Sequence, residues 1–298
     1  MPHYQPITCK SAMNRINSRY LPFHWDLNLY RGCAHCCQYC YALYTHDYME
    51  DHRFFDTIYI KQNIADRLAT ELAKPQWKRE VVNVGGITDS YQPIEAEMQL
   101  MPDILKLLIQ YKTPCIISTK SDLILRDFDL LDQLSRIAYV NVAATITTTD
   151  ETLRKKLEPG GVPSDRRFSM LKAFAKTKVH TGLHAMPIIP LLTDSDENLE
   201  SLFAGGAEAK ADYILPGLLN LKGKTREHFL EFFHMEFPEK MDAFLNLYGR
   251  GGLDKAYKKS FYQKLSKINE KYRLTMGHRL PKSIQQVSDD DGQQLSLF

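Results

Sequence analysis

Residues 28–42 read Asn-Leu-Tyr-Arg-Gly-Cys-Ala-His-Cys-Cys-Gln-Tyr-Cys-Tyr-Ala and hold four of the six cysteines of this 298-residue chain. A disulfide framework spreads its cysteines, and a large chain without an export signal has little use for one. Four cysteines within eight residues instead indicate a metal or redox site. Without Cys36, the cluster is a C-x3-C-x2-C set made of Cys33, Cys37 and Cys40.

Two kinds of metal site compete for these cysteines. Structural zinc takes four thiolate or imidazole ligands, which usually come as two short pairs separated by a dozen or more residues. Here Cys36 and Cys37 are adjacent and the sequence offers no second pair. Three thiolates on one loop can instead hold three irons of a 4Fe–4S cluster, and the fourth iron then stays open for a substrate or cofactor.

On both sides of the cysteines, apolar runs rich in β-branched residues alternate with segments of helical periodicity up to residue 217. Several of the runs are continuously apolar, as expected of a parallel sheet covered by helices. Repeated units of this length predict an open or closed parallel α/β barrel with its chemistry at the carboxyl ends of the strands. The expected strands are 27–30, 57–60, 81–85, 115–119, 140–147, 179–186 and 213–216.

The cysteine motif, with an aromatic residue before its last cysteine, is the signature of the radical S-adenosylmethionine (SAM) superfamily. The full pattern Asn28-x-Tyr30-x-Gly32-Cys33-x-His35-x-Cys37-x-Tyr39-Cys40-Tyr41-Ala42 resembles the spore photoproduct lyase-like branch. The resemblance covers roughly residues 25–220. Further matching segments are 86–95, 118–121, 125–127, 145–150 and 186–190.

This resemblance implies a partial (β/α)6 barrel with a 4Fe–4S cluster, held by Cys33, Cys37 and Cys40, at its open mouth. In the superfamily, SAM chelates the open iron, and an electron donor reduces the cluster. SAM is then cleaved to methionine and a 5′-deoxyadenosyl radical, which abstracts a hydrogen atom from the substrate. The cofactor carries this chemistry, and the protein supplies orientation and electrostatics.

The resemblance also assigns roles around the cofactor. Tyr39 matches an aromatic residue near the adenine, and Lys120 matches a lysine that meets the SAM carboxylate. Thr145 stands where the branch has a serine that contacts the ribose, and His35 is expected to order the loop. For each strand-end residue, a capping role is the alternative. The expected cofactor contacts are Tyr39, Gly85, Gly86, Thr88, Asp89, Lys120 and Thr145.

One departure concerns the last step of the lyase reaction. The lyase repairs a thymine dimer and returns a hydrogen atom from a cysteine roughly forty residues after the cluster motif. No cysteine lies between Cys40 and Cys115 here, and Cys115 is expected to fill the core. The two tyrosines that assist hydrogen return do match, as Tyr39 and Tyr41. The radical generator is therefore expected to be intact, whereas the chain lacks the cysteine that returns the hydrogen atom in the repair reaction of the lyase.

The C-terminal quarter has a different character. Residues 225–247 and 252–273 are predicted to be helices, and residues 250–282 contain ten Lys or Arg but two acidic residues. A basic helical face can neutralise phosphates, so we expect DNA as a partner, with a solvated helix surface as the alternative. The expected nucleic-acid contacts are Lys255, Lys258, Lys259, Lys264, Lys267, Lys271 and Arg273.

The polar tail ends in Gln294-Leu295-Ser296-Leu297-Phe298. This peptide resembles the motif by which bacterial polymerases and repair proteins bind the replication sliding clamp, through Gln294, Leu295, Leu297 and Phe298. Two leucines and a phenylalanine on a disordered tail can enter an apolar groove. We therefore expect an N-terminal extension (1–24), the partial barrel (25–220), a basic helical extension (221–282) and a disordered clamp-binding tail (283–298).

The composition fits a globular protein, with 44% hydrophobic and 25% charged residues and a net charge of +2. No run of 18 apolar residues and no signal pattern occurs, so we expect a cytoplasmic protein without a membrane span. The expected function is radical SAM chemistry on a DNA base lesion. The alternatives are RNA, a peptide or a metabolite as substrate, a non-enzymatic clamp-tethered DNA-binding module, and a zinc protein.

Overall fold

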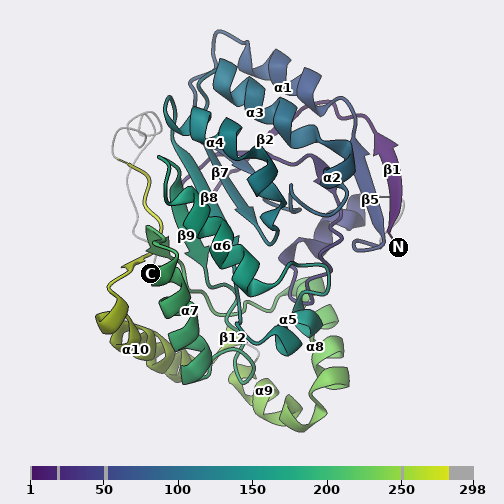
Figure 1. Cartoon of the computed structure of the whole chain (residues 1–298). Helices are drawn as coiled ribbons and strands as arrows, with labels where there is room; N and C mark the ends of the chain where they lie inside the picture. The colour runs from purple at the N-terminus through teal and green to yellow at the C-terminus, as the bar shows by residue number, and fades with distance from the viewer. Residues whose placement is uncertain (1, 19–20, 50–52, 250–251, 282–298) are drawn as a thin grey trace.

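An eight-stranded sheet forms the centre of the computed structural model, which describes residues 2–18, 21–49, 53–249 and 252–281 (Figure 1). The strand order is β13-β10-β9-β8-β7-β6-β3-β2, and the neighbours from β3 to β13 all pair in parallel, whereas β2 is antiparallel. The strands are β2 (Met13–Arg15), β3 (Trp25–Leu27), β6 (Val82–Val84), β7 (Cys115–Thr119), β8 (Val140–Thr145), β9 (His180–His184), β10 (Tyr213–Ile214) and β13 (Thr275–Met276).

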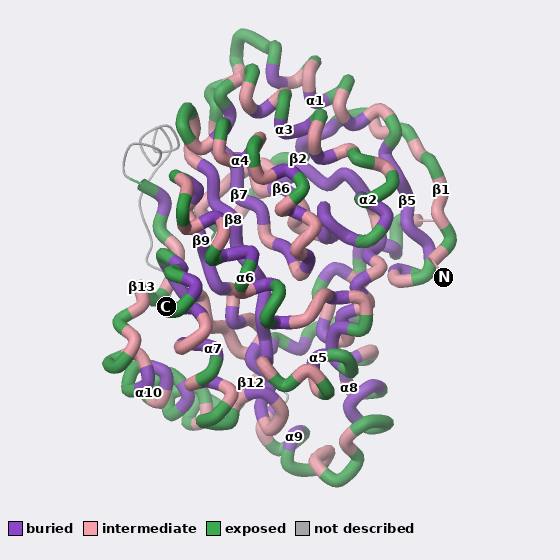
Figure 2. Tube along the Cα trace, viewed as in Figure 1, coloured by how far each residue is buried: buried purple, intermediate pink, exposed green. Residues whose placement is uncertain are grey.

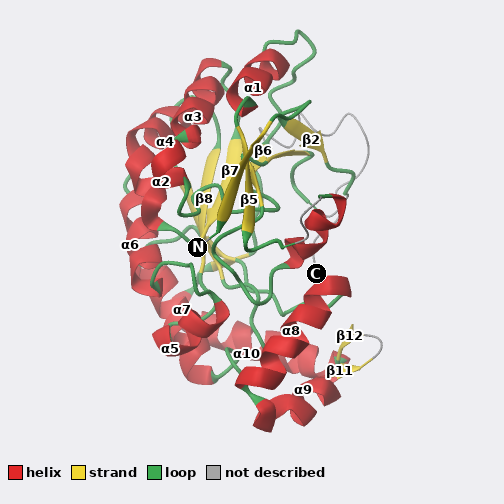
Figure 3. Cartoon of the chain, turned by 90° about the vertical axis from the view of Figure 1, so that its right-hand side faces the viewer, coloured by secondary structure: helices red, strands yellow, loops and turns green. Residues whose placement is uncertain are grey.

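The helices that connect the strands gather on one face of this sheet (Figure 3). Their apolar residues recur every three or four positions, which gives each helix one face that can be buried against the strands. The helices between the strands are α1 (Ile64–Leu72), α2 (Glu95–Met98), α3 (Leu100–Gln110), α4 (Phe128–Ser135), α5 (Glu151–Leu157), α6 (Ser164–Phe174) and α7 (Asp196–Glu208). The expected partial (β/α)6 barrel is thereby confirmed, with β13 as an added parallel edge strand.

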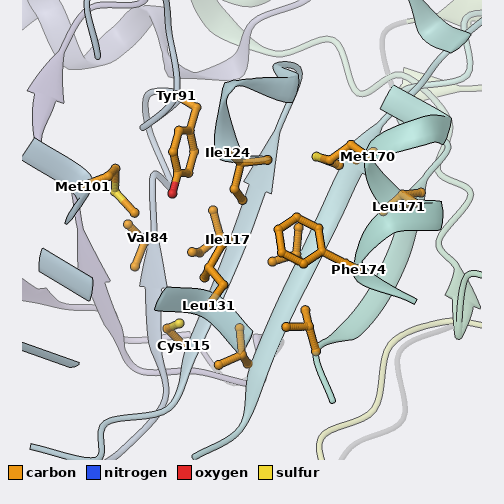
Figure 4. Packing of buried hydrophobic residues seen from close by; sticks show 14 of the residues in the cluster. Val84, Tyr91, Met101, Cys115, Ile117, Ile124, Leu131, Met170, Leu171 and Phe174 are labelled. Atoms are coloured by element: carbon orange, nitrogen blue, oxygen red, sulfur yellow. The ribbon is translucent and has the colours of Figure 1, made fainter. Parts of the chain in front are cut away.

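Alternation along the strands separates an apolar outer face from a polar inner face. Outward-facing residues such as Val84 and Ile117 pack with Leu131 of α4 and Phe174 of α6 in the main core (Figure 4). Cys115 belongs to this core and is fully buried, as expected of a filler. The intervening strand positions carry Asn83, Ser118, Asn141, His180, His184 and Tyr213.

Two of the expected strands differ from the structure. The run 27–30 is split, because Leu27 ends β3 in the barrel sheet whereas Tyr30 begins β4 (Tyr30–Arg31) of a second sheet. The run 57–60 lies in β5 (Thr57–Lys61), which pairs with β4 and with β1 (His3–Ile7) rather than with a barrel strand. The N-terminal extension thus contributes β1 to the small sheet and β2 to the edge of the barrel sheet.

The single helix expected over 225–247 is interrupted. Helix α8 (Gly223–Glu236) ends before a 3₁₀ turn, η3 (Pro238–Lys240), and α9 (Met241–Leu247) follows. Pro238 has no backbone N–H to donate to a helical carbonyl, and its ring would clash with the carbonyl group four residues earlier. Helix α8 therefore cannot continue through Pro238, which instead begins the next turn. A short hairpin, β11 (Tyr248–Gly249) and β12 (Gly252–Leu253), leads to α10 (Lys255–Tyr272).

The two parts of this C-terminal segment cover different regions. Phenylalanines of α8 and α9 form a cluster with Cys37 and Tyr39, so these helices close over the cysteine loop. Helix α10 instead packs beside α7 and exposes most of its other side (Figures 1 and 2). No helix within the described residues is both long and apolar enough to cross a bilayer. The expected clamp-binding residues Gln294, Leu295, Leu297 and Phe298 lie outside the described residues.

Candidate functional site

The cysteine loop lies between β4 and a 3₁₀ helix, η1 (Tyr41–Tyr48). Cys33 and Cys37 are buried, and Cys40 is half-buried. Burial raises the pKa of Cys33 and Cys40 to about 12. Cys36 has a left-handed backbone (φ 53°), and its Sγ donates to the carbonyl oxygen of Ala34 at 3.4 Å. Cys36 thus adopts a left-handed conformation between Cys33 and Cys37.

Residues that follow β6 hold the start of this loop. Thr88 Oγ1 donates to the carbonyl oxygen of Gly32 at 2.7 Å, and Gln92 Nε2 donates to the same oxygen at 3.3 Å. The Gln92 Oε1 atom accepts from the Ala34 N–H at 2.9 Å. Gly32 itself has φ 82°, and a Cβ there would lie 2.8 Å from the Phe54 carbonyl oxygen. The loop conformation is therefore fixed by hydrogen bonds on both sides of Cys33.

Asp89 connects the loop to the third barrel strand. Its carboxylate lies 3.1 Å from His35 Nε2 and accepts from Thr119 Oγ1 at 2.8 Å and from the Lys120 N–H at 2.8 Å. Burial alone would raise the pKa of Asp89, but the His35 ring and the hydrogen bonds hold it below its usual value. His35 Nδ1 contacts the Gly160 carbonyl oxygen at 2.8 Å. His35 orders the loop as expected, and the oxygens of Thr88 and Asp89 are already engaged by the protein.

A buried ion pair supports Tyr39. Glu158 Oε2 lies 2.5 Å from Arg167 Nη1, and the exposed fractions of the two side chains are 0% and 1%. The Tyr39 hydroxyl donates to Glu158 Oε1, and Arg167 Nη1 also donates to the Thr145 carbonyl oxygen at 2.7 Å. Burial would raise the pKa of Glu158, but the charges of Arg167 and Lys120 keep it ionised. This pair therefore links Tyr39, next to Cys40, to the carboxyl end of β8.

Lys120 brings a positive charge to the same region. Its Nζ lies 5.7 Å from the centre of the Tyr39 ring, within the range of a cation–π contact. Burial would lower the pKa of Lys120, but Cys37, Glu158 and Asp89 raise it above its ordinary value, so the amine stays protonated. A protonated amine beside the thiols suits a ligand that carries a carboxylate.

The two glycines after β6 are required by the protein itself. Gly85 has φ 88°, and a Cβ there would lie 2.8 Å from the Thr88 carbonyl oxygen. A Cβ on Gly86 would collide with the Asp26 carboxylate. The Gly86 carbonyl oxygen accepts from the hydroxyl of Tyr41, whose side chain is otherwise exposed. Both glycines are thus needed for the packing of this segment.

The residues of this site fit a three-cysteine iron–sulfur cluster. Each thiol of such a cluster binds its own iron, so the thiols need not surround one point. Among the described residues, no three or more His, Cys, Asp or Glu side chains surround the position of a single metal ion. These residues therefore contain no preassembled four-ligand site for zinc. Bound iron would deprotonate Cys33, Cys37 and Cys40, because a coordinating thiol loses its proton.

The basic residues expected to contact nucleic acid are not equivalent. Lys264 Nζ lies 2.6 Å from Asp196 Oδ1, and Lys271 Nζ lies 3.1 Å from Glu200 Oε2, so these two lysines bind α10 to α7. The remaining ones are exposed on α10 or directly after it: Lys255, Lys258, Lys259, Lys267 and Arg273. They lie on a different helix from the phenylalanines that cover the cysteine loop.

Sequence reasoning missed Glu158 and Arg167 altogether. The signal that could have found Glu158 is the turn that follows it, Pro159-Gly160-Gly161, because Gly160 lies directly against the cysteine loop. A Cβ on Gly160 would lie 2.8 Å from the Cα of His35. A turn that approaches another backbone so closely is a reason to examine the polar residue beside it.

The family model of the radical SAM superfamily matches residues 27–203. An uncharacterized protein of Mycobacterium tuberculosis is 34% identical over 281 residues, which cover 93% of this chain and 83% of that protein. An uncharacterized protein of Methanocaldococcus jannaschii is 28% identical over 237 residues, covering 79% and 85%.

Among solved structures, a spore photoproduct lyase mutant with bound AdoMet and dinucleoside spore photoproduct has a TM-score of 0.68 to this chain. The match has 14% sequence identity and covers 92% of this chain and 80% of the lyase chain. A second lyase structure, complexed with dinucleoside spore photoproduct, has a TM-score of 0.67 at 13% identity. At this level of identity the likeness concerns the fold.

Proposed function

This chain belongs to the radical SAM superfamily, and on that premise we propose that it acts on a lesion in a DNA base. It is a radical SAM enzyme, and its family uses a 4Fe–4S cluster and SAM. When bound, these groups supply the 5′-deoxyadenosyl radical that abstracts a hydrogen atom. The observation that carries the choice of DNA is the shared fold over 92% of the chain with a lyase that holds a dinucleoside lesion.

Within this proposal, Cys33, Cys37 and Cys40 hold the cluster, and Lys120 binds the SAM carboxylate. Support comes from the burial of the thiols beside a protonated amine. Tyr39 is held by Glu158 at the side of the site, where its ring can pack against the adenine. Gly85, Gly86 and Thr145 present their backbone or hydroxyl at the strand ends nearby. Thr88 and Asp89 act mainly by positioning the loop and Lys120.

The final hydrogen donor must differ from that of the lyase. The stretch 84–88 reads Val-Gly-Gly-Ile-Thr and offers no thiol. Cys115 cannot replace it, because its side chain is buried in the core on the outer face of β7. Tyr39 and Tyr41 remain as candidates for hydrogen return, and both hydroxyls donate to partners in the site.

The proposal is tested by anaerobic reconstitution with iron and sulfide, followed by dithionite and SAM, with and without ultraviolet-irradiated DNA. We expect irradiated DNA to stimulate 5′-deoxyadenosine formation and undamaged DNA of the same sequence to have no such effect. Deuterium from a labelled lesion should appear in 5′-deoxyadenosine. SAM cleavage that no DNA changes would overturn the choice of substrate and favour RNA, a peptide or a metabolite.

We further propose that the exposed side of α10 binds the DNA backbone. Replacing Lys255, Lys258 and Lys259 together by Gln is expected to weaken DNA binding and to reduce the slope of log Kd against log salt by about 2 to 3, since each phosphate contact contributes about 0.9. Fluorescence anisotropy over a salt series measures both. The control is Lys106→Gln with Lys172→Gln, two exposed lysines on α3 and α6. Equal slopes in both variants would refute a role for α10.

Tethering to the sliding clamp is proposed from the sequence of the tail alone. Removal of residues 294–298 is expected to abolish binding to a bacterial sliding clamp and to leave SAM cleavage unchanged, because no described residue of the site belongs to the tail. Surface plasmon resonance on immobilised clamp measures the first effect. Replacing Ser296 by Ala is the matched control, since that side chain is not one of the four that would enter the groove. Unchanged clamp binding after the deletion would refute the tether.

A further inference from the structure

His184 lies at the end of β9 on the inner, polar face of the sheet. Its Nδ1 atom is 3.4 Å from Ser118 Oγ on β7, and its Nε2 atom is 3.0 Å from the hydroxyl of Tyr213 on β10. Lys120 follows Ser118 by two residues, so the alternation of the strand places it on the same side of the sheet as Ser118. This imidazole therefore lies beside the residue that we assign to SAM, and none of the roles described above uses it.

A chain of hydrogen bonds that starts at a backbone carbonyl fixes the proton on this ring. Asn141 pairs with His180 in the parallel register of β8 and β9, and its Nδ2 donates to the His180 carbonyl oxygen at 3.1 Å. A carbonyl can only accept, so this bond fixes which end of the Asn141 amide is the NH2 group. The other end, Oδ1, must then accept.

The orientation of Asn141 sets the direction of the next two bonds. Tyr213 donates its only hydroxyl proton to Asn141 Oδ1 at 3.1 Å, so its oxygen can only accept from His184. His184 therefore carries its proton on Nε2, and its Nδ1 presents a lone pair. Tyr213 cannot move away easily, because its exposed fraction is 1% and its ring occupies the space above Gly182 where a side chain would be.

The Nδ1 lone pair is only weakly used by the protein. A distance of 3.4 Å to Ser118 Oγ is well beyond the usual length of a hydrogen bond to a hydroxyl. Burial and the charges of His278 and Lys120 lower the pKa of His184 to about 3, so the ring is neutral. A neutral ring with an underused lone pair, beside a cationic donor, complements a group that has an N–H next to a carbonyl.

We infer that His184 is a substrate-binding residue whose Nδ1 accepts a hydrogen bond from the N–H of a nucleobase lesion, such as the imide of a thymine-derived base. The identity of the donor rests on the proposed function. The fixed tautomer does not, because it follows from the hydrogen bonds of the protein. A cytosine-derived base has no imide N–H and should be bound less well at this position.

The tautomer is tested first, on the oxidised, reconstituted holoenzyme labelled with ¹⁵N-histidine. The His184 signals are identified by their absence in His184→Asn. We expect a single neutral form with the proton on Nε2 in the wild type at neutral pH. Tyr213→Phe, which cannot accept a hydrogen bond, should give a mixture of tautomers. A proton on Nδ1 in the wild type, or the same single tautomer in Tyr213→Phe, would overturn the inference.

The substrate contact is tested by the stimulation that irradiated oligothymidylate produces, relative to each variant's own background without DNA. In His184→Leu the stimulation should be about tenfold smaller than in the wild type, which is the factor expected for one hydrogen bond. His184→Asn keeps a hydrogen-bond acceptor and should retain most of the stimulation. Equal stimulation in His184→Leu and wild type would refute the contact and leave the proposed function standing. No stimulation in the wild type would overturn both the proposed function and the nucleobase assignment. The tautomer of His184 would still be established by the ¹⁵N-histidine measurement, which uses no DNA.

Discussion

Replacing Cys33, Cys37 or Cys40 by Ala, one at a time, is expected to abolish the visible absorbance of the reconstituted cluster and all formation of 5′-deoxyadenosine. Each thiol would hold a different iron, so the loss of one leaves two ligands on a site that already has one open iron. Outside the cysteine loop, no described thiol is placed to take over. Cys115 is buried in the outer core, and Cys9 hydrogen-bonds to Asn63 beside the small sheet.

Cys36→Ala is the matched control for these variants. It removes a thiol one residue from Cys37, but the Cys36 side chain donates to the Ala34 carbonyl oxygen, and the backbone there has φ 53°. Cysteine and alanine bear a similar cost at such a φ, so the loop should keep its conformation. Iron and sulfide content and the visible spectrum are measured for all four variants. Loss of the cluster in Cys36→Ala, or its retention in the other three, would contradict the ligand set.

The parts of the fold that the sequence predicts are those fixed by local pattern. Strand β7, for example, has the predicted boundaries, Cys115–Thr119. The division of the run 27–30 was not predictable, because Leu27 and Tyr30 are both apolar and both buried. Only their partners differ, Val84 for Leu27 and Ile60 for Tyr30, and these pairings are long-range.

Long-range contacts also decide which charged residues form ion pairs within the protein. The lysines of α10 look alike in the sequence, yet Lys264 and Lys271 meet acidic residues of α7 that lie about seventy positions earlier. Glu158 and Arg167 would be expected at the surface, because such residues are rarely buried unless paired. Their burial depends on the approach of the 158–161 turn to the cysteine loop, which no local pattern reports.

Arg167→Met is expected to lower the free energy of unfolding by about 3–5 kcal/mol, because it removes the arginine that forms the ion pair with the buried Glu158 carboxylate. The neighbouring Arg166→Met is the matched control. Arg166 also forms an ion pair, with Asp122 at 2.6 Å, but 56% of its side chain is exposed. Exposed pairs contribute about 1 kcal/mol or less, so the control should unfold close to the wild type. Urea unfolding, monitored by circular dichroism, measures both variants.

Adding Glu158→Gln to Arg167→Met should restore part of the lost stability, because a neutral amide no longer needs a counter-ion and its oxygen can still accept from the Tyr39 hydroxyl. This double variant separates the cost of an unpaired charge from the loss of arginine packing. If Arg167→Met unfolds no more easily than Arg166→Met, the pair does not support the site. If the double variant is no more stable than Arg167→Met, the contribution of Arg167 lies in its hydrogen bonds to Thr145 and Val162 rather than in charge pairing.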